Sequence, residues 1–148
     1  NISLRVFSLR SWAGETTIDF NRPNRTTIEY FSVHCTIGET TLTHLGNAHI
    51  EEANINSGIG DLTVDFNGDC ACDMHAKIDL DIGETDITVP RSNGVKMDIS
   101  KFILSTMDIS DWFHKRRGDY YSENYSDAGR HLEFDISSGL GELTIHAH

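Results

Sequence analysis

Apolar and polar residues alternate along several short stretches of this chain. In residues 62–66, Leu62, Val64 and Phe66 alternate with threonine and aspartate. The other stretches with this two-residue period are 33–37, 78–82, 85–89 and 132–136. Because successive side chains of a β-strand point to opposite faces, the pattern predicts strands with one buried face. No stretch has convincing helical periodicity, so the sequence predicts an all-β fold.

A six-residue motif recurs along the sequence, in the order apolar, glycine, acidic, variable, polar, apolar. Its copies are residues 13–18, 37–42, 59–64, 82–87 and 140–145. The first four glycines are 22 to 24 residues apart. A degenerate copy at residues 104–109 has Ser105 in place of the glycine and lies in the longer interval before Gly141. A period of this length is typical of repeat proteins whose units stack on one another.

Each repeat has room for two strands, one before and one after the glycine, as in a coil of a β-helix. The sequence therefore predicts a right-handed parallel β-solenoid of about six coils, since parallel crossover connections are almost always right-handed. The glycine would form a corner, where a positive φ or close stacking is easy without a Cβ. We expect a single domain over residues 1–148, with an inserted loop at about residues 112–129 that accounts for the longest interval.

Four asparagines follow the repeat glycines by seven to ten residues. They are Asn21, Asn47, Asn67 and Asn93. Their spacing favours a second corner in each coil, because asparagine tolerates the left-handed conformation. The alternative fold is a β-sandwich of hairpins, which Asn67-Gly68 and Asn93-Gly94 favour because Asn-Gly is the strongest short hairpin signal. We prefer the solenoid because the asparagines follow the repeat.

The charge of the chain restricts its partners. It has 23 acidic and 12 basic residues and a formal net charge of -11. Nucleic acids and anionic membrane surfaces are therefore unfavourable partners, because both require a concentrated basic face. No apolar run approaches the roughly 20 residues that span a bilayer, so any membrane segment of the protein is expected outside this chain. The three cysteines are too few for the disulfide framework of a small secreted scaffold.

Three segments and the end of the chain carry a resemblance to known domains. The segments are residues 57–66, 82–90 and 93–95, and residues 132–143 repeat the same unit of strand, corner and strand. They resemble the β-solenoid domains of the LiaF-like and toastrack adhesin group, over roughly residues 53–148. The resemblance implies a non-catalytic bacterial domain, often attached to membrane segments and linked in LiaF-like proteins to regulation of an envelope-stress sensor kinase. Ser105 and the inserted loop depart from the pattern of this group.

Stacked coils would align the acidic residues that follow the glycines. These are Glu15, Glu39, Asp61, Glu84 and Glu142, in a column interrupted by Thr106. Neighbouring strands lie about 4.8 Å apart, so aligned carboxylates repel one another unless they splay apart, bind cations or meet a basic partner. One hypothesis is a cation site with Glu39, Asp61 and Glu84 as metal ligands, or a surface for a basic partner. The favoured interpretation is structural, with carboxylates that are solvated or accept hydrogen bonds from corner amides.

Residues 70–75 contain Cys70, Cys72 and His75 at close spacing, which suggests a soft-metal site. Structural zinc normally needs four ligands with more regular spacing. Alternate cysteines on a strand would share one face, so two buried, small apolar side chains are the favoured interpretation. His146 and His148 have two equally good interpretations, an additional metal contact near the end of the sequence or an exposed tail.

The expected insertion is aromatic and basic on an otherwise acidic chain, and aromatic residues and arginine are enriched at binding hot spots. The candidate partner-binding residues are Trp112, Phe113, Arg116, Arg117, Tyr120 and Tyr121. The equally weighted alternative is that the aromatic side chains of this loop fold over an open end or side of the solenoid and cover its core.

No nucleophile elbow, phosphate-binding loop or His-Glu-x-x-His motif is present, so we expect no catalytic residues and no cofactor. The sequence predicts a bacterial interaction or regulatory domain associated with the cell envelope. An adhesin-like or carbohydrate-binding module is the alternative, and the partner is accordingly a protein or a glycan at the envelope. Exposed ends of the coil stack would also allow a homo-oligomer by end-to-end pairing.

Overall fold

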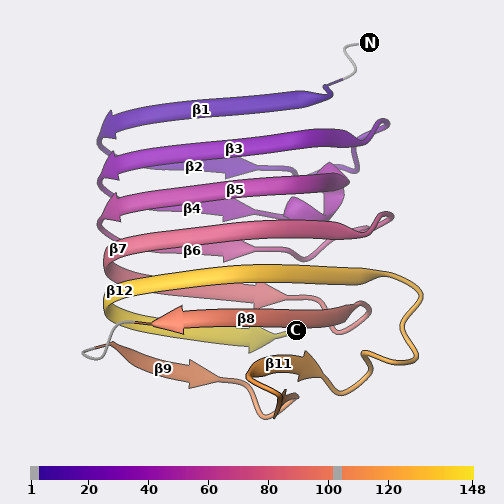
Figure 1. Cartoon of the computed structure of the whole chain (residues 1–148). Helices are drawn as coiled ribbons and strands as arrows, with labels where there is room; N and C mark the ends of the chain where they lie inside the picture. Colours follow the sequence, from indigo (N-terminus) through magenta and orange to yellow (C-terminus); the bar gives the residue numbers. More distant parts are fainter. Residues whose placement is uncertain (1–3, 102–104) are drawn as a thin grey trace.

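The computed structural model describes residues 4–101 and 105–148, and these residues form an all-β fold, as the sequence predicts. The long strands that face the viewer in Figure 1 make up a front layer. In spatial order they are β1 (Val6–Ala13), β3 (Ile28–Ile37), β5 (Ile50–Ile59), the first half of β7 (Met74–Val89), the first half of β12 (His131–Ala147) and β8 (Gly94–Lys101).

A rear layer of shorter strands lies behind the first (Figure 1). It contains β2 (Thr16–Asp19), β4 (Thr40–Thr43), β6 (Leu62–Asp65), the second halves of β7 and β12, and β9 (Thr106–Ile109). The chain passes from the front layer to the rear layer at each repeat glycine. Within the described ranges, all pairs between these strands are parallel. The hairpin sandwich is therefore wrong, and Asn67-Gly68 instead joins β6 to β7, two strands that pair in parallel.

The spatial order of the strands differs from their order along the chain. β12 lies between β7 and β8, and it pairs in parallel with both. Its register with β7 runs along both halves of the strand, from Leu132 beside Met74 to Ala147 beside Val89. The residues between β9 and β12 give the chain enough length to pass the end of the stack and return. Leu104, the first residue of the degenerate repeat, lies outside the described residues.

The insertion is not a free loop. Residues of the expected 112–129 loop form β10 (Phe113–Arg116) and β11 (Asp119–Ser122), an antiparallel hairpin that also pairs with β8. The hairpin lies at the lower end of the stack in Figure 1. At the opposite end, β1 is the outermost strand of the front layer. The two ends of the stack therefore differ.

The core runs between the two layers along the length of the stack. In β7 the buried residues alternate with exposed ones, as the two-residue period predicts. Phe66 and Phe134 are fully buried, and their rings meet edge to face with centroids 4.8 Å apart. Burial of a large apolar side chain contributes about 1.5–3 kcal/mol, so the rows of inward-facing side chains supply much of the driving force for folding.

The asparagines act differently from the expectation. Among the described residues, the non-glycine positions with positive φ are His44, His49 and Arg117, so none of the four asparagines is left-handed. Asn47 instead joins neighbouring repeats: its Nδ2 donates to the carbonyl oxygen of Phe20 (2.9 Å), and its Oδ1 accepts from the backbone N–H of Asp69 (2.8 Å). His44 and His49 flank the short 3-10 helix η1 (Leu45–Ala48) and provide the left-handed turns there.

Candidate functional site

Three parallel rows of residues form the corner between the front and rear layers. The aliphatic ladder consists of Ala13, Ile37, Ile59, Ile82 and Leu140. The corner glycines follow at Gly14, Gly38, Gly60, Gly83 and Gly141. The acidic ladder comes next, at Glu15, Glu39, Asp61, Glu84 and Glu142. The repeat motif thus translates directly into three rows along one edge of the molecule.

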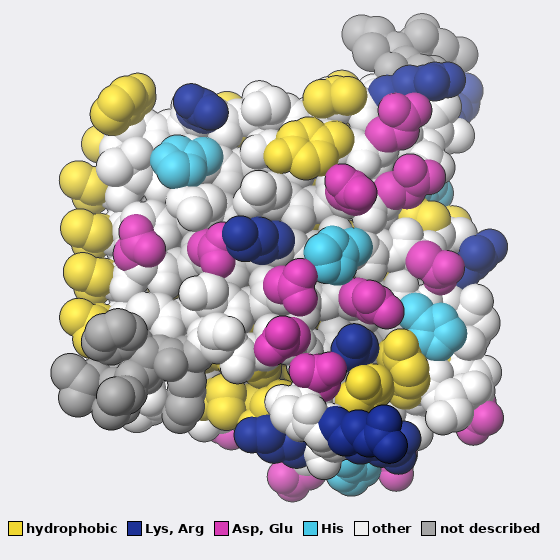
Figure 2. Space-filling model, in the orientation of Figure 1, with side chains coloured by type: hydrophobic (Ala, Val, Ile, Leu, Met, Phe, Trp, Pro, Cys, Tyr) yellow, Lys and Arg dark blue, Asp and Glu magenta, His cyan; other side chains and the backbone are white. Residues whose placement is uncertain are grey.

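The side chains of the aliphatic ladder are exposed to an unusual extent for such apolar residues. Ile37, Ile59, Ile82 and Leu140 are 53%, 49%, 45% and 40% exposed. Figure 2 shows them as a continuous yellow column along the left edge of the molecule. Trp12, beside Ala13 at the end of the ladder, is 84% exposed. Contiguous exposed apolar side chains mark interaction sites more often than single ones do, so this column is a candidate docking surface.

The acidic ladder runs without interruption, contrary to the expectation that Thr106 would break it. Because β12 lies between β7 and β9, Glu142 pairs with Glu84 on one side and with Thr106 on the other. Thr106 therefore ends the row. The backbone N–H of Glu84 donates to Oδ1 of Asp61 (3.3 Å), which is the type of corner hydrogen bond that the structural interpretation anticipates.

The metal hypothesis gains no support from the geometry. In the described ranges, no group of three histidine, cysteine, aspartate or glutamate side chains is arranged to hold a metal ion. This applies to the candidate ligands Glu39, Asp61 and Glu84. The exposed carboxylates remain available to a basic partner.

The six candidate partner-binding residues of the insertion divide into two groups. Trp112 and Phe113 are buried, only 8% and 7% exposed, and their rings meet edge to face with centroids 5.2 Å apart. They belong to the buried core, as the equally weighted alternative expects, so they are not exposed for contact with a partner. Arg116 and Arg117 are exposed, and Tyr120 and Tyr121 are partly buried.

The hairpin is held to the front layer by a chain of hydrogen bonds. The backbone N–H of Val95 donates to Oγ of Ser122 (2.9 Å), whose hydroxyl donates to Oδ1 of Asn124 (2.8 Å). Nδ2 of Asn124 then donates to the carbonyl oxygen of Arg91 (3.0 Å). The buried Ser122 thus satisfies an amide at the edge of β8 that would otherwise lose water without gaining a partner.

The exposed side of the hairpin carries cations over aromatic rings. Nζ of Lys115 lies 5.5 Å from the centroid of the Tyr120 ring, and the guanidinium of Arg116 lies 5.9 Å from that of Tyr121. Both distances are within the range of cation–π attraction. Arg117, with a φ of 54°, and Gly118 form the tip of the turn. The basic residues therefore project from the end of the molecule, where Figure 2 shows a group of dark blue side chains.

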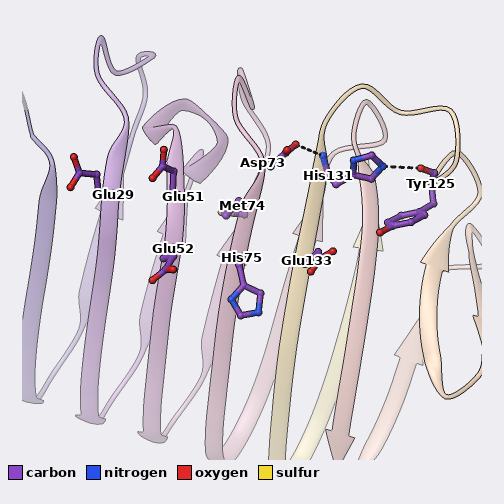
Figure 3. Close-up of a pocket in the computed structure, with 9 residues that line it drawn as sticks. All are labelled: Glu29, Glu51, Glu52, Asp73, Met74, His75, Tyr125, His131 and Glu133. Carbon is purple, nitrogen blue, oxygen red and sulfur yellow. Dashed lines mark hydrogen bonds between the residues drawn. The ribbon is translucent and has the colours of Figure 1, made fainter.

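A second candidate site is a cavity of about 680 Å³ on the front face, shown in Figure 3. Its lining residues are Glu29, Glu51, Glu52, Asp73, Met74, His75, Tyr125, His131 and Glu133. The backbone N–H of His131 donates to Asp73 (2.9 Å), and the His131 ring meets the Tyr125 ring edge to face. Burial and the nearby Glu133 raise the pKa of the Tyr125 hydroxyl. Polar groups and an aromatic face therefore converge in one acidic cavity.

Sequence reasoning did not identify this cavity. Glu52, His75 and Glu133 lie far apart along the chain, and parallel pairing brings them to the same level of the sheet. Tyr125 comes from the insertion. The available signal was the charged residues at outward positions of the front strands, but locating them together requires the strand order.

The cysteines of residues 70–75 lie in the loop before β7, not on a strand. Sγ of Cys70 donates to the carbonyl oxygen of Phe66 and Sγ of Cys72 to that of Ile50, both at 3.4 Å. Burial raises the pKa of the Cys70 thiol to about 12 and also raises that of Cys72. Among the residues that the structure describes, no third histidine, cysteine, aspartate or glutamate completes a metal-binding group with these cysteines, so the geometry does not support the soft-metal hypothesis. Both side chains are only partly buried.

At the C-terminal end of β12, Nε2 of His146 lies 3.6 Å from Oδ1 of Asp86.

No helix in the described ranges is long and apolar enough to cross a membrane. Among proteins with curated descriptions, none matches the sequence. The fold is similar to the crystal structure of a candidate cell adhesion protein from Clostridium sporogenes, with a TM-score of 0.83 and 15% sequence identity. The similarity covers 99% of this chain and 93% of that protein, and at this identity it concerns the fold alone.

The family of the chain is established by its sequence. Residues 36–145 match the family described as "Cell wall-active antibiotics response LiaF, C-terminal". The match begins earlier than the resemblance identified from the motifs alone, and it confirms that resemblance. Because it covers most of the chain, the protein belongs to the LiaF-like C-terminal domain family.

Proposed function

We propose that this domain is a non-catalytic interaction module, associated with the bacterial cell envelope, that regulates a response to cell-wall stress by binding a protein partner. The family, which is named for the response to cell wall-active antibiotics, supports the regulatory role. The aliphatic ladder is the observation that carries the binding role. Four large apolar side chains in successive coils are between 40% and 53% exposed, although they could be polar without loss to the core.

The scaffold in this proposal is a right-handed parallel β-solenoid of about six coils. The parallel registers at the repeat spacing support it, and right-handed crossovers are nearly universal. A rigid stack of this kind presents aligned rows of side chains without having to order them on binding, which reduces the entropic cost of association.

The exposed arginines of the hairpin offer a second contact surface. Arg116 and Arg117 project from the end of the stack, and a partner with carboxylates there would complement them. Trp112 and Phe113 contribute by holding the hairpin in place, and Tyr120 and Tyr121 by supporting the basic side chains through their rings.

A reporter of the cell-wall stress response in the host bacterium tests the proposal. The test variant combines Ile59→Ser and Ile82→Ser in the full protein, and the control is Val6→Ser, which changes an aliphatic residue of similar exposure outside the ladder. We expect the ladder variant to alter the reporter signal, with and without a cell wall-active antibiotic, while the control behaves as the parent protein. An unchanged signal from a ladder variant that is present at normal levels and folded would overturn the proposal.

The cavity of Figure 3 favours a carbohydrate-binding or adhesin-like role as a second candidate. An aromatic ring beside several carboxylates is a suitable arrangement for a sugar, because the ring packs on the sugar face and the carboxylates accept from hydroxyl groups. Saturable binding to a glycan array that is lost in Tyr125→Ala and retained in Ile59→Ser would favour this candidate. No binding to any glycan on the array would reject it.

A further inference from the structure

We propose that the aliphatic ladder and the acidic ladder together dock a basic amphipathic α-helix of the partner protein. The inference rests on the proposed function and adds the chemistry of the partner. Its helix would place one apolar row on Ile37, Ile59 and Ile82, and a flanking row of lysine or arginine on the carboxylates.

The spacing of the rungs suits a helix lying along the ladder. Successive parallel strands are about 4.8 Å apart, whereas one turn of an α-helix rises about 5.4 Å. Over the three intervals from Ile37 to Leu140 the mismatch is only about 2 Å, which flexible side chains can absorb. The whole ladder, from Ala13 to Leu140, would accommodate a helix of about 13 residues.

The charge beside the ladder selects the type of helix. Five carboxylates lie in one row, all of them exposed, and the corner glycines between the two ladders carry no side chains. In the described part of the chain, none of the ion pairs involves a residue of the acidic ladder. Aligned carboxylates about 4.8 Å apart repel one another, and a row of lysine or arginine side chains would relieve this repulsion.

Two other occupants are less suited to the same edge. An anionic membrane would be repelled by the acidic ladder. A second copy of this chain would bring together two molecules that each carry a net charge of -11. A helix with basic flanks satisfies the apolar row and the acidic row at once.

Synthetic peptides provide the test. The probe is a 16-residue amphipathic helix with leucine on one face and lysine on the flanks, labelled for fluorescence anisotropy. One control peptide has glutamate in place of every lysine, and another has the same composition in an order that abolishes the apolar face. We expect the lysine peptide to bind at least about tenfold more tightly than either control at low salt, and to weaken as salt screens the carboxylates.

Protein variants locate the site. Ile59→Ser with Ile82→Ser should weaken binding of the lysine peptide by about tenfold or more, because both remove apolar surface from the contact. Glu39→Gln, Asp61→Asn and Glu84→Gln together should weaken it at low salt and flatten the salt dependence. Asp135→Asn, which removes an exposed carboxylate from the front face, is the matched control and should leave binding unchanged.

Equal binding of the three peptides, or equal binding by the ladder variants, would overturn the inference. A second result would also overturn it. In this result the parent protein self-associates in sedimentation or binds anionic vesicles, Ile59→Ser with Ile82→Ser removes that association, and the same variant still binds the lysine peptide. The outcome is separable from that of the proposed function. If the ladder variant changes the stress reporter but the parent protein does not bind the lysine peptide, the basic helix is rejected and the regulatory role is kept. If the lysine peptide binds but the ladder variant does not change the reporter, the basic helix is kept and the regulatory role is rejected.

Discussion

Gly60 and Gly83 occupy successive rungs of the corner, so close that a Cβ on Gly83 would overlap the carbonyl oxygen of Gly60. Both residues have a positive φ, of 136° and 141°. The corner therefore requires glycine for two independent reasons, the backbone conformation and the close approach of the backbone of the neighbouring repeat. This double requirement explains why glycine recurs in the motif.

We predict that Gly83→Ala lowers the free energy of unfolding by about 2–4 kcal/mol, because it adds steric overlap to the strain of a positive φ. Two controls separate these causes. Gly14→Ala has a positive φ but open space around the new Cβ, and should cost about 1–2 kcal/mol. Gly129→Ala has neither feature and should change stability by less than about 0.5 kcal/mol. Urea denaturation of the three variants measures the differences, and equal effects at Gly83 and Gly14 would contradict the role of close stacking.

Thr85 has a buried hydroxyl without a hydrogen-bond partner. Its neighbours in the same row are Leu62 and Leu143, so an apolar side chain is already accommodated one rung away on each side. We predict that Thr85→Val raises the free energy of unfolding by about 1 kcal/mol, because it removes an unsatisfied polar group with little change of shape.

The control for this substitution is Thr16→Val in the same inward row. The Thr16 hydroxyl accepts a hydrogen bond from Sγ of Cys35 (3.6 Å), so its replacement should not stabilise the protein. Thermal or urea denaturation of both variants decides the matter. Destabilisation by Thr85→Val would mean that its hydroxyl finds a partner in solution.

The local features of the fold could be predicted from sequence because they depend on neighbouring residues. The two-residue period around Leu62 and Val64 sets which side chains are buried, and the glycine motif sets where the chain turns. The alignment of Glu39 and Asp61 follows from the repeat spacing alone.

The spatial order of the strands could not be predicted in this way. β12 alternates like β7 and β8, so nothing in its local pattern indicates which strands it will join. Its place between them brings Glu133 next to His75 and makes Glu142 the neighbour of Glu84. The cavity of Figure 3 and the unbroken acidic ladder both depend on that order, which is a long-range property. Trp112 was ambiguous because an aromatic side chain suits both a binding surface and a covered core.

The thiol of Cys70 should be unreactive in the folded protein. Burial, with smaller contributions from nearby acidic groups and Cys72, raises its pKa from the ordinary value of 9.0 to about 12. Since the thiolate is the nucleophile, its population at pH 8 should be about a thousandfold lower than in the unfolded chain. We predict correspondingly slow alkylation by iodoacetamide, measured by mass spectrometry of peptides that contain Cys70, and rapid alkylation after denaturation in urea.

The same pKa shift predicts a dependence of stability on pH. The folded protein retains a proton on Cys70 that the unfolded chain loses above about pH 9, so the stability contributed by this group decreases as pH rises from about 9 towards 12. By pH 10.5 the loss should be about 1–2 kcal/mol relative to pH 8. Cys70→Ser does not titrate in this range and serves as the control. A constant difference in stability between parent and variant over this pH range would contradict the assignment.

Trp112 is predicted to act in stability, not as a contact for a partner. Its ring is buried against Phe113, and the guanidinium of Arg91 lies 5.7 Å from its centroid. Truncation by Trp112→Ala should cost about 3 kcal/mol through the cavity it leaves. It should also loosen the hairpin, so hydrogen exchange at the Val95 amide, which is bonded to Ser122, should accelerate.

The neighbouring His114 provides the matched control for Trp112, because it lies on the same hairpin and is exposed. His114→Ala should change stability by less than about 0.5 kcal/mol and leave exchange at Val95 unchanged. Denaturation midpoints and amide exchange together distinguish the two roles of Trp112. If Trp112→Ala weakened partner binding while both measurements stayed at parent values, the buried ring would be acting through contact after all, and the hairpin would have to open to expose it.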